Sequence, residues 1–165
     1  MNRESLHRES KQHDKVADQS STFEDLHVYQ LAREFRKAMY QVAKKLPEEE
    51  KFGLANQIRR AAVSLTNNIA EGHGRYHFLD QIRFTLHSRG SLEELLDDVN
   101  VCIDERYLPP EEVNSLKQQG WRVRQLIDGY VRYLRQQKNS AAGSDSVREE
   151  SPEYSEEIDD SRFSI

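Results

Sequence analysis

One run of the chain, residues 57–74, constrains the fold more than any other. It reads QIRRAAVSLTNNIAEGHG, and its apolar residues recur at spacings of four, three and four. These spacings place one set of side chains on a single face of a helix: Ile58, Ala62, Leu65 and Ile69. Such a face must pack against other helices. We expect this helix to span about Gly53 to Ala70, with Gly72 and Gly74 ending it.

Another helix precedes it. Thr22 and Asp25 resemble a capping box at the start of this helix, and Pro47 closes it. A short acidic link, Glu48 to Lys51, leads to the run described above. The apolar stripe of this first helix has helical spacing and comprises Val28, Leu31, Ala32, Phe35, Met39, Val42 and Leu46.

Two further helices follow. One begins near Tyr76 or His77 and continues to about Glu105, with a kink or a close helix contact expected at Arg89 and Gly90. Its predicted stripe is Phe78, Ile82, Leu86, Leu92, Leu95 or Leu96, Val99 and Ile103. The last starts near Pro110, and its stripe is Val113, Leu116, Val123, Ile127, Tyr130 or Val131, and Leu134. Four amphipathic helices with short links predict an all-α, up-and-down antiparallel four-helix bundle over residues 23–138.

The charge distribution separates the two ends of the chain from this bundle. Only 36% of the 165 residues are hydrophobic, and 32% are charged. Residues 139–165 carry eight acidic residues against two arginines, which exceeds the net charge of −5 for the whole chain. We therefore expect an acidic disordered tail over 139–165 and a disordered polar arm over 1–22. The acidic pI of 5.7 belongs to that tail.

Bulk features also limit the cellular setting. The single cysteine, Cys102, rules out an intramolecular disulfide, and we expect it to be a small core residue. The start MNRESLHRESKQHDK is not followed by an apolar run, and no segment approaches the length needed to cross a bilayer. We therefore expect a soluble, cytoplasmic protein without a membrane contact.

The polar residues of the 57–74 run admit two interpretations. They are Ser64, Asn67, Asn68 and Glu71. They could form a polar site, but we favour contacts with neighbouring helices or subunits, because buried polar groups must be hydrogen-bonded. His73 and His77 have a spacing that can share a metal on a helix, but the surrounding glycines suggest a loop. We predict no catalytic residue, no metal and no cofactor.

Basic residues give the better functional argument. A set on the second and fourth helices and the link between the second and third could contact nucleic-acid phosphates: Arg59, Arg60, Arg75, Arg122, Arg124, Arg132, Arg135 and Lys138. The competing interpretation is a solvated face with ion pairs between helices.

Several runs together resemble one known family. They are FEDLHVYQLAREF, KFGLANQIRRAA, QIRRAAVSLTNNIAEGHGR and RGSLEELLDDV, in this order over residues 23–138. They resemble the bacterial four-helix bundle family of proteins encoded in intervening sequences of the 23S ribosomal RNA gene. The resemblance implies a ring-like homopentamer and a distant kinship with accessory proteins of diversity-generating retroelements, which bind a reverse transcriptase and its RNA template. Thr66 and Asn67 depart from the proline and serine often found in that family.

These observations lead to a functional hypothesis and an alternative. We expect a non-enzymatic homo-oligomeric scaffold or adaptor that binds RNA or a nucleoprotein, such as a reverse transcriptase complex, through basic residues. The alternative is a protein–protein adaptor that acts through the acidic tail, without nucleic acid. The tail has apolar residues spaced among carboxylates that suit a partner-binding motif: Tyr154, Ile158, Phe163 and Ile165.

Overall fold

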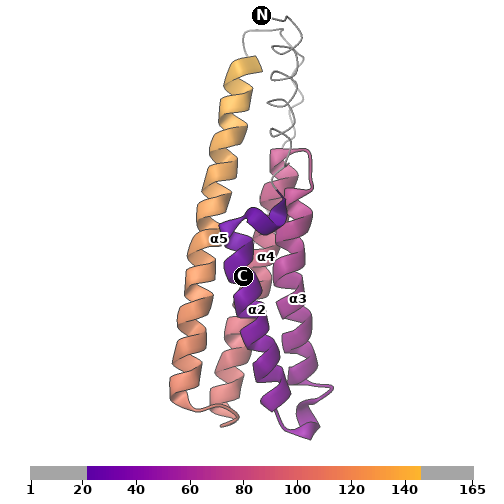
Figure 1. The fold of residues 1–165 in the computed structure, drawn as a ribbon, viewed down its shortest axis with the longest axis vertical. Helices are drawn as coiled ribbons and strands as arrows, with labels where there is room; N and C mark the ends of the chain where they lie inside the picture. The colour runs from indigo at the N-terminus through magenta and orange to yellow at the C-terminus, as the bar shows by residue number, and fades with distance from the viewer. Residues whose placement is uncertain (1–21, 146–165) are drawn as a thin grey trace, which may run out of the picture.

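The structure, a computed structural model, describes residues 22–145. Four α-helices run up and down in sequence order, and no strand is found in this part of the chain (Figure 1). The helices are α2 (His27–Lys45), α3 (Leu54–His73), α4 (Phe78–Asp104) and α5 (Pro110–Asp145), with the 3-10 helices η1 (Phe23–Asp25) and η2 (Glu48–Glu50). The predicted all-α four-helix bundle is confirmed.

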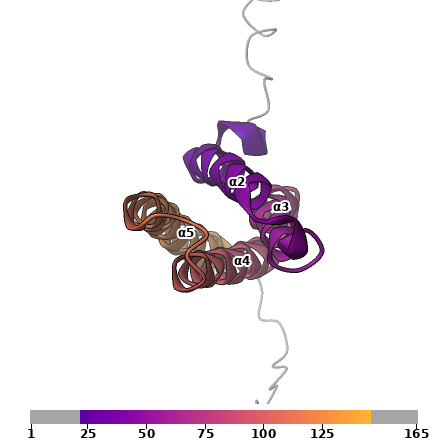
Figure 2. The same ribbon diagram turned by 90° about the horizontal axis from the view of Figure 1, so that it is seen from below.

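The four helices enclose a core in a cyclic order. α2 packs against α3 and α5, and α4 packs against the same two helices, so α3 and α5 are diagonal neighbours (Figure 2). The core holds most of the predicted apolar stripes, including the fully buried Phe35, Ile58 and Leu65. Gly120 lets α5 approach closely, because a Cβ atom there would lie 2.6 Å from Cδ2 of Leu96 and 3.3 Å from Cζ of Phe35.

The start of the bundle differs from the prediction in one detail. The capping box of Thr22 and Asp25 is present, with the Thr22 backbone N–H donating to Oδ2 of Asp25 at 2.8 Å. It caps η1 rather than an α-helix, and α2 begins only at His27. Leu26 has extended backbone angles that separate the two elements.

The end of α3 also lies further along the chain than expected. The helix continues to His73, so Gly72 lies inside it and only Gly74 caps it. Gly72 is buried against α4, where a Cβ atom would lie 3.1 Å from Cβ of Phe84 and 3.2 Å from the carbonyl oxygen of Gln81. This glycine therefore permits close helix contact, the role that we had expected near Gly90.

Two expectations for α4 are wrong. The helix is continuous through Gly90, and a Cβ atom there would meet nothing within 4 Å, so Gly90 is not a close contact. Leu86 is 42% exposed, whereas the small hydroxyl residues Thr85, Ser88 and Ser91 are buried. Hydroxyl groups can be buried there because they donate to carbonyl oxygens, as Thr85 Oγ1 does to Gln81 at 2.7 Å.

The last helix is longer than predicted. Pro110 is its first residue, with Glu111 and Glu112 in the first turn, as expected. α5 continues past residue 138 to Asp145 and extends beyond the ends of the other three helices (Figure 1). Residues 1–21 and 146–165, with Tyr154, Ile158, Phe163 and Ile165 of the tail, lie outside the described residues.

Candidate functional site

An open groove of about 1270 Å³ runs between the outer faces of α3 and α4. It lies in the half of the bundle where α3 begins and α4 ends. The α3 side supplies amide and basic side chains, among them Asn56, Arg60 and Asn67, and the α4 side supplies carboxylates. The groove therefore has two chemically different walls.

Hydrogen bonds join these walls at the floor of the groove. Ser91 Oγ of α4 donates to Ser64 Oγ of α3 at 2.8 Å, and Asn68 Nδ2 donates to the same Ser64 oxygen at 3.0 Å. One turn along α4, the buried Ser88 Oγ donates to the Leu65 carbonyl oxygen at 2.7 Å. The structure thus places Ser64 in a contact that joins α3 to α4, whereas Asn68 bonds within α3, to the carbonyl and hydroxyl oxygens of Ser64. Asn67 is exposed in the groove.

Sequence reasoning missed the most unusual group of the groove, Asp98. Its side chain is only 2% exposed, and Oδ1 accepts a hydrogen bond from Gln57 Nε2 at 2.9 Å. Oδ2 is buried and has no hydrogen-bond partner among residues 22–145. Burial raises the pKa of Asp98 to about 6, with the negative charges of Glu94 and Asp97 adding to the effect, although the bond from Gln57 opposes it.

A sequence signal for Asp98 did exist. Asp98 follows Leu95 by three residues and precedes Cys102 by four, and both of these residues are fully buried. An acidic residue at this spacing falls on the core side of a helix, where an unpaired carboxylate is costly.

The groove contains few neutralising charges. Glu94 and Asp97 are exposed on α4, and neither forms an ion pair with any described residue. Arg59 is half-buried, and its Nη2 donates to the Ala43 carbonyl oxygen at 3.4 Å, near the end of α2. Arg60 is the exposed cation of the α3 wall. The carboxylates of the other wall weaken any attraction of this groove for phosphates.

Two of the predicted phosphate contacts are engaged in ion pairs. Arg75 pairs with Glu71 and lies over the ring of Phe84, 4.5 Å from the ring centroid. Arg124 Nε lies 3.3 Å from Glu93 Oε1, close enough for an ion pair but without hydrogen-bond geometry.

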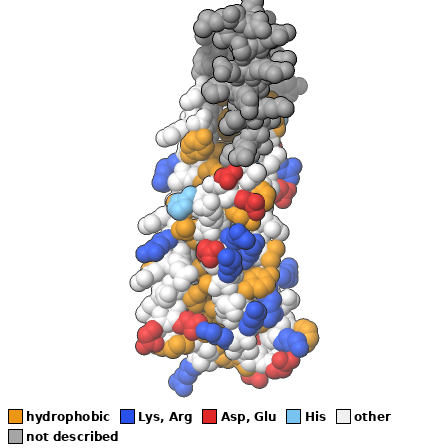
Figure 3. All heavy atoms as spheres, viewed as in Figure 1, with side chains coloured by type: hydrophobic (Ala, Val, Ile, Leu, Met, Phe, Trp, Pro, Cys, Tyr) orange, Lys and Arg blue, Asp and Glu red, His pale blue; other side chains and the backbone are white. Residues whose placement is uncertain are grey.

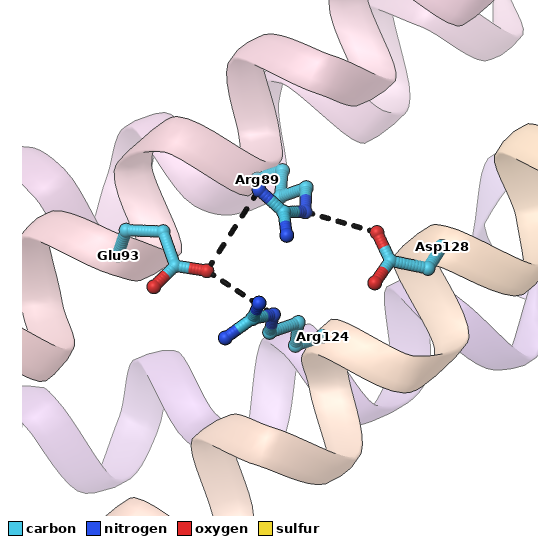
Figure 4. Close-up of polar contacts among 4 residues, drawn as sticks. All are labelled: Arg89, Glu93, Arg124 and Asp128. Atoms are coloured by element: carbon cyan, nitrogen blue, oxygen red, sulfur yellow. Dashed lines mark hydrogen bonds and ion pairs between the residues drawn. The ribbon is translucent and has the colours of Figure 1, made fainter.

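Arg124 belongs to a cluster of four residues that joins α4 to α5 (Figure 4). Arg89 Nε donates to Asp128 Oδ1 at 2.9 Å, and Arg89 Nη1 lies 4.0 Å from Glu93 Oε1. The exposed fraction of these four side chains is between 33% and 42%. Arg124 therefore forms an ion pair between helices, as the alternative to phosphate contacts had it.

The other predicted basic residues of α5 are exposed. They form no ion pair with any residue between 22 and 145: Arg122, Arg132, Arg135 and Lys138. Because α3 and α5 are diagonal, these side chains do not join Arg59 and Arg60 in one patch. On the face shown in Figure 3, basic and acidic side chains are interspersed along the bundle.

The two histidines and the cysteine considered in the sequence do not form a site. His73 is the last residue of α3 and His77 precedes α4, so the pair spans the link and does not share one helical face. Cys102 is buried in the core, as expected, and burial raises the pKa of its thiol to about 11, with a smaller effect from the charge of Asp98. Among the described residues, no helix has the length and apolar character to cross a membrane.

Comparison with known protein families gives a match. The model of a family described as 23S rRNA-intervening sequence protein matches residues 24–129, from η1 to the middle of α5. No curated protein matches the chain. The match covers the groove and the ion-pair cluster, and it ends before the exposed basic residues at the far end of α5.

Proposed function

The chain belongs to the 23S rRNA-intervening sequence protein family, and from this premise we propose that it is a non-enzymatic homo-oligomeric scaffold that binds RNA or a nucleoprotein. The assembly is the homopentameric ring that the sequence resemblance implies. RNA contacts the distal half of α5, and the chain provides a binding surface rather than a reaction centre.

One observation carries the RNA-binding part of this proposal. Arg132, Arg135 and Lys138 recur every three residues along α5, all are exposed, and none forms an ion pair with another described residue. This spacing puts one cation on each successive turn of the helix. Tyr133 lies among them, is 52% exposed and stacks on Tyr130 with ring centroids 6.2 Å apart. Cations beside an exposed aromatic ring suit phosphate contacts and base stacking.

The polar residues of α3 support a scaffold rather than a catalyst. Ser64 accepts hydrogen bonds from Asn68 of its own helix and from Ser91 of α4, and the bond from Ser91 holds α3 against α4. A serine nucleophile needs an adjacent base to become reactive. The contacts of Ser64 here are those of a structural hydroxyl.

The proposal is tested by the mass of the purified protein in light scattering, with and without a short structured RNA, at about 50 mM and about 300 mM salt. We expect a multimer that gains the mass of RNA only at low salt. Exchanging Arg132→Gln and Arg135→Gln together should weaken RNA binding and lower the slope of log K against log salt by about 0.7 to 0.9 per lost contact.

A matched control is the double variant Arg33→Gln and Lys44→Gln. It removes two exposed cations of α2 that form no ion pair within residues 22–145. It should bind RNA nearly as the unchanged protein does. A multimer that ignores RNA at both salt concentrations contradicts the RNA-binding part of the proposal, and a monomer contradicts the scaffold.

A further inference from the structure

Only one of the two carboxylate oxygens of Asp98 has a hydrogen-bond donor. Gln57 Nε2 donates a hydrogen bond to Oδ1, whereas Oδ2 is buried and has no hydrogen-bond partner among the described residues. A buried carboxylate normally has a cation or several hydrogen-bond donors beside it, because leaving water is costly for a charge. Asp98 lies in the lining of the α3–α4 groove, so a charge that enters the groove comes near this carboxylate although Oδ2 itself is buried.

The surroundings of Asp98 specify the chemistry of such a group. Glu94 and Asp97 on α4 add negative charge, and Glu50 faces the same groove. Glu50 is already engaged, since its two oxygens accept from the Leu54 backbone N–H and the Tyr107 hydroxyl. On the α3 side, Gln57 is neutral and Arg59 is held by Ala43, which leaves Arg60 as the facing cation. The α4 wall therefore favours an incoming cation.

The groove also offers apolar surface. Phe52 is 85% exposed and Val101 is 37% exposed, and both line the groove. A complementary surface thus combines a cation with a large apolar or aromatic side chain. Tryptophan and arginine are the residues that most often dominate the affinity of protein interfaces.

The same chain presents that combination on α5. Trp121, its single tryptophan, is 51% exposed, and the adjacent Arg122 is exposed without an ion pair among residues 22–145. At a rise of about 1.5 Å per residue, Asp98 lies about 9 Å before the end of α4, and Trp121 lies about 16 Å after the start of α5. Groove and tryptophan thus stand at similar levels near the same end of the bundle.

We propose that the α3–α4 groove binds the Trp121 and Arg122 face of α5 from a second copy of this chain. Arg122 of that copy supplies the cation that the Asp98, Asp97 and Glu94 wall lacks, and Trp121 covers Phe52 and Val101. The two surfaces lie on different parts of one subunit, so the contact is heterologous, which is the type of contact that builds the proposed ring. This inference rests on the proposed homo-oligomer and names the surfaces that build it.

Charge exchange at exposed positions tests this contact without disturbing the core. Asp97→Lys and Arg122→Glu should each weaken association by about tenfold or more, seen in light scattering as a shift toward the 19.3 kDa subunit. Combining the two changes should restore much of the assembly, because the charges are exchanged across the interface. Asp104→Lys, an exposed position on α4 outside the groove, is the matched control and should leave the mass unchanged.

A second variant probes the buried group. Asp98→Asn should weaken association while raising the thermal stability of the subunit, a combination that a merely misfolded variant cannot give. A multimer whose mass is unaffected by Asp97→Lys and Arg122→Glu, or a double variant no better than either single one, overturns this inference and leaves the scaffold proposal intact. A wild-type chain that is monomeric at both salt concentrations overturns both.

Discussion

Helix α2 and helix α4 bury different kinds of side chain. The buried residues of α2 are all apolar, with Phe35 and Met39 the largest. α4 buries Thr85, Ser88, Ser91 and Asp98 together with its leucines. Apolar packing tolerates repacking as long as volume is kept, whereas buried polar groups require named partners at fixed distances. We conclude that α2 mainly supplies core volume, while α4 fixes its position against α3 and so shapes the groove.

The largest expected effect on stability comes from a change in the apolar core of α2. Phe35→Ala removes a ring that is 1% exposed and should lower the free energy of unfolding by about 3 to 5 kcal/mol. Leu79→Ala is the matched control, because Leu79 is 61% exposed and lies outside the groove, and it should change stability by about 0.5 kcal/mol at most. Denaturant unfolding measures both. Equal effects would contradict the described core.

The next effect comes from a buried polar residue of α4, and here the substitution raises stability. Asp98→Asn should raise the free energy of unfolding of the separate subunit by roughly 2 to 3 kcal/mol at pH 7.5, because within one subunit it removes a buried charge that has no cation beside it. The folded state raises the pKa of Asp98 from its ordinary value of 3.8 to about 6. The unfolded chain therefore loses this proton at a lower pH than the folded chain does.

The contribution of Asp98 to stability is consequently most favourable below about pH 4 and declines as the pH rises to about 6. Thermal unfolding of the wild type and of Asp98→Asn across this window tests the sign. Their difference in stability should grow with rising pH and then level off. Asp104→Asn, at an exposed position of α4 outside the groove, should show no such growth. A constant difference between the wild type and Asp98→Asn would contradict the described environment.

A smaller effect separates the interhelical hydroxyls from exposed ones. Ser88→Ala deletes the bond from Ser88 Oγ to the Leu65 carbonyl oxygen and should cost about 1 kcal/mol of stability. Ser115→Ala, on the exposed side of α5, should cost less than about 0.5 kcal/mol. Chemical denaturation of the two variants measures the contrast. If the order were reversed, the hydroxyls of α4 would not hold α3.

The smallest effect distinguishes two glycines of the α3–α4 pair. Gly90→Ala should raise stability by about 0.5 to 1 kcal/mol, because alanine favours the helix and open space receives its methyl group. At Gly72 the methyl group meets Phe84 and the Gln81 carbonyl oxygen, so Gly72→Ala should lower stability. Thermal unfolding of both variants gives the two signs. A gain at Gly72 would mean that the two helices can separate without cost.

The sequence predicted the four helices well because their apolar residues repeat with the helical period. The periodicity of apolar residues gave the wrong core positions where small polar residues are buried. Leu86 fitted the stripe by hydropathy but is partly exposed, and Ser88 is buried because its hydroxyl reaches Leu65 on another helix. Periodicity along one helix contains no information about partners on the next.

The candidate site was only partly predictable for a related reason. Ser64 was expected to contact a neighbouring helix, since buried polar side chains need partners, and it bonds to Ser91 of α4, whereas the bonds of Asn68 stay within α3. The eight basic residues could not be sorted, because which helices are diagonal is a property of the packing rather than of any single helix. Arg124 meets Glu93 and is engaged, while Arg132 lies beyond the ion-pair cluster and is exposed.

The cyclic order of the helices also has a consequence for folding. The contacts of α2 with α3, α3 with α4 and α4 with α5 join sequence neighbours and close quickly, whereas the α2–α5 contact joins the first and the last α-helix of the bundle. We expect the α2–α5 contact, in which the Phe35 ring lies close to Gly120, to close last. A destabilising change in α2 at Phe35 should then accelerate unfolding more than it slows folding.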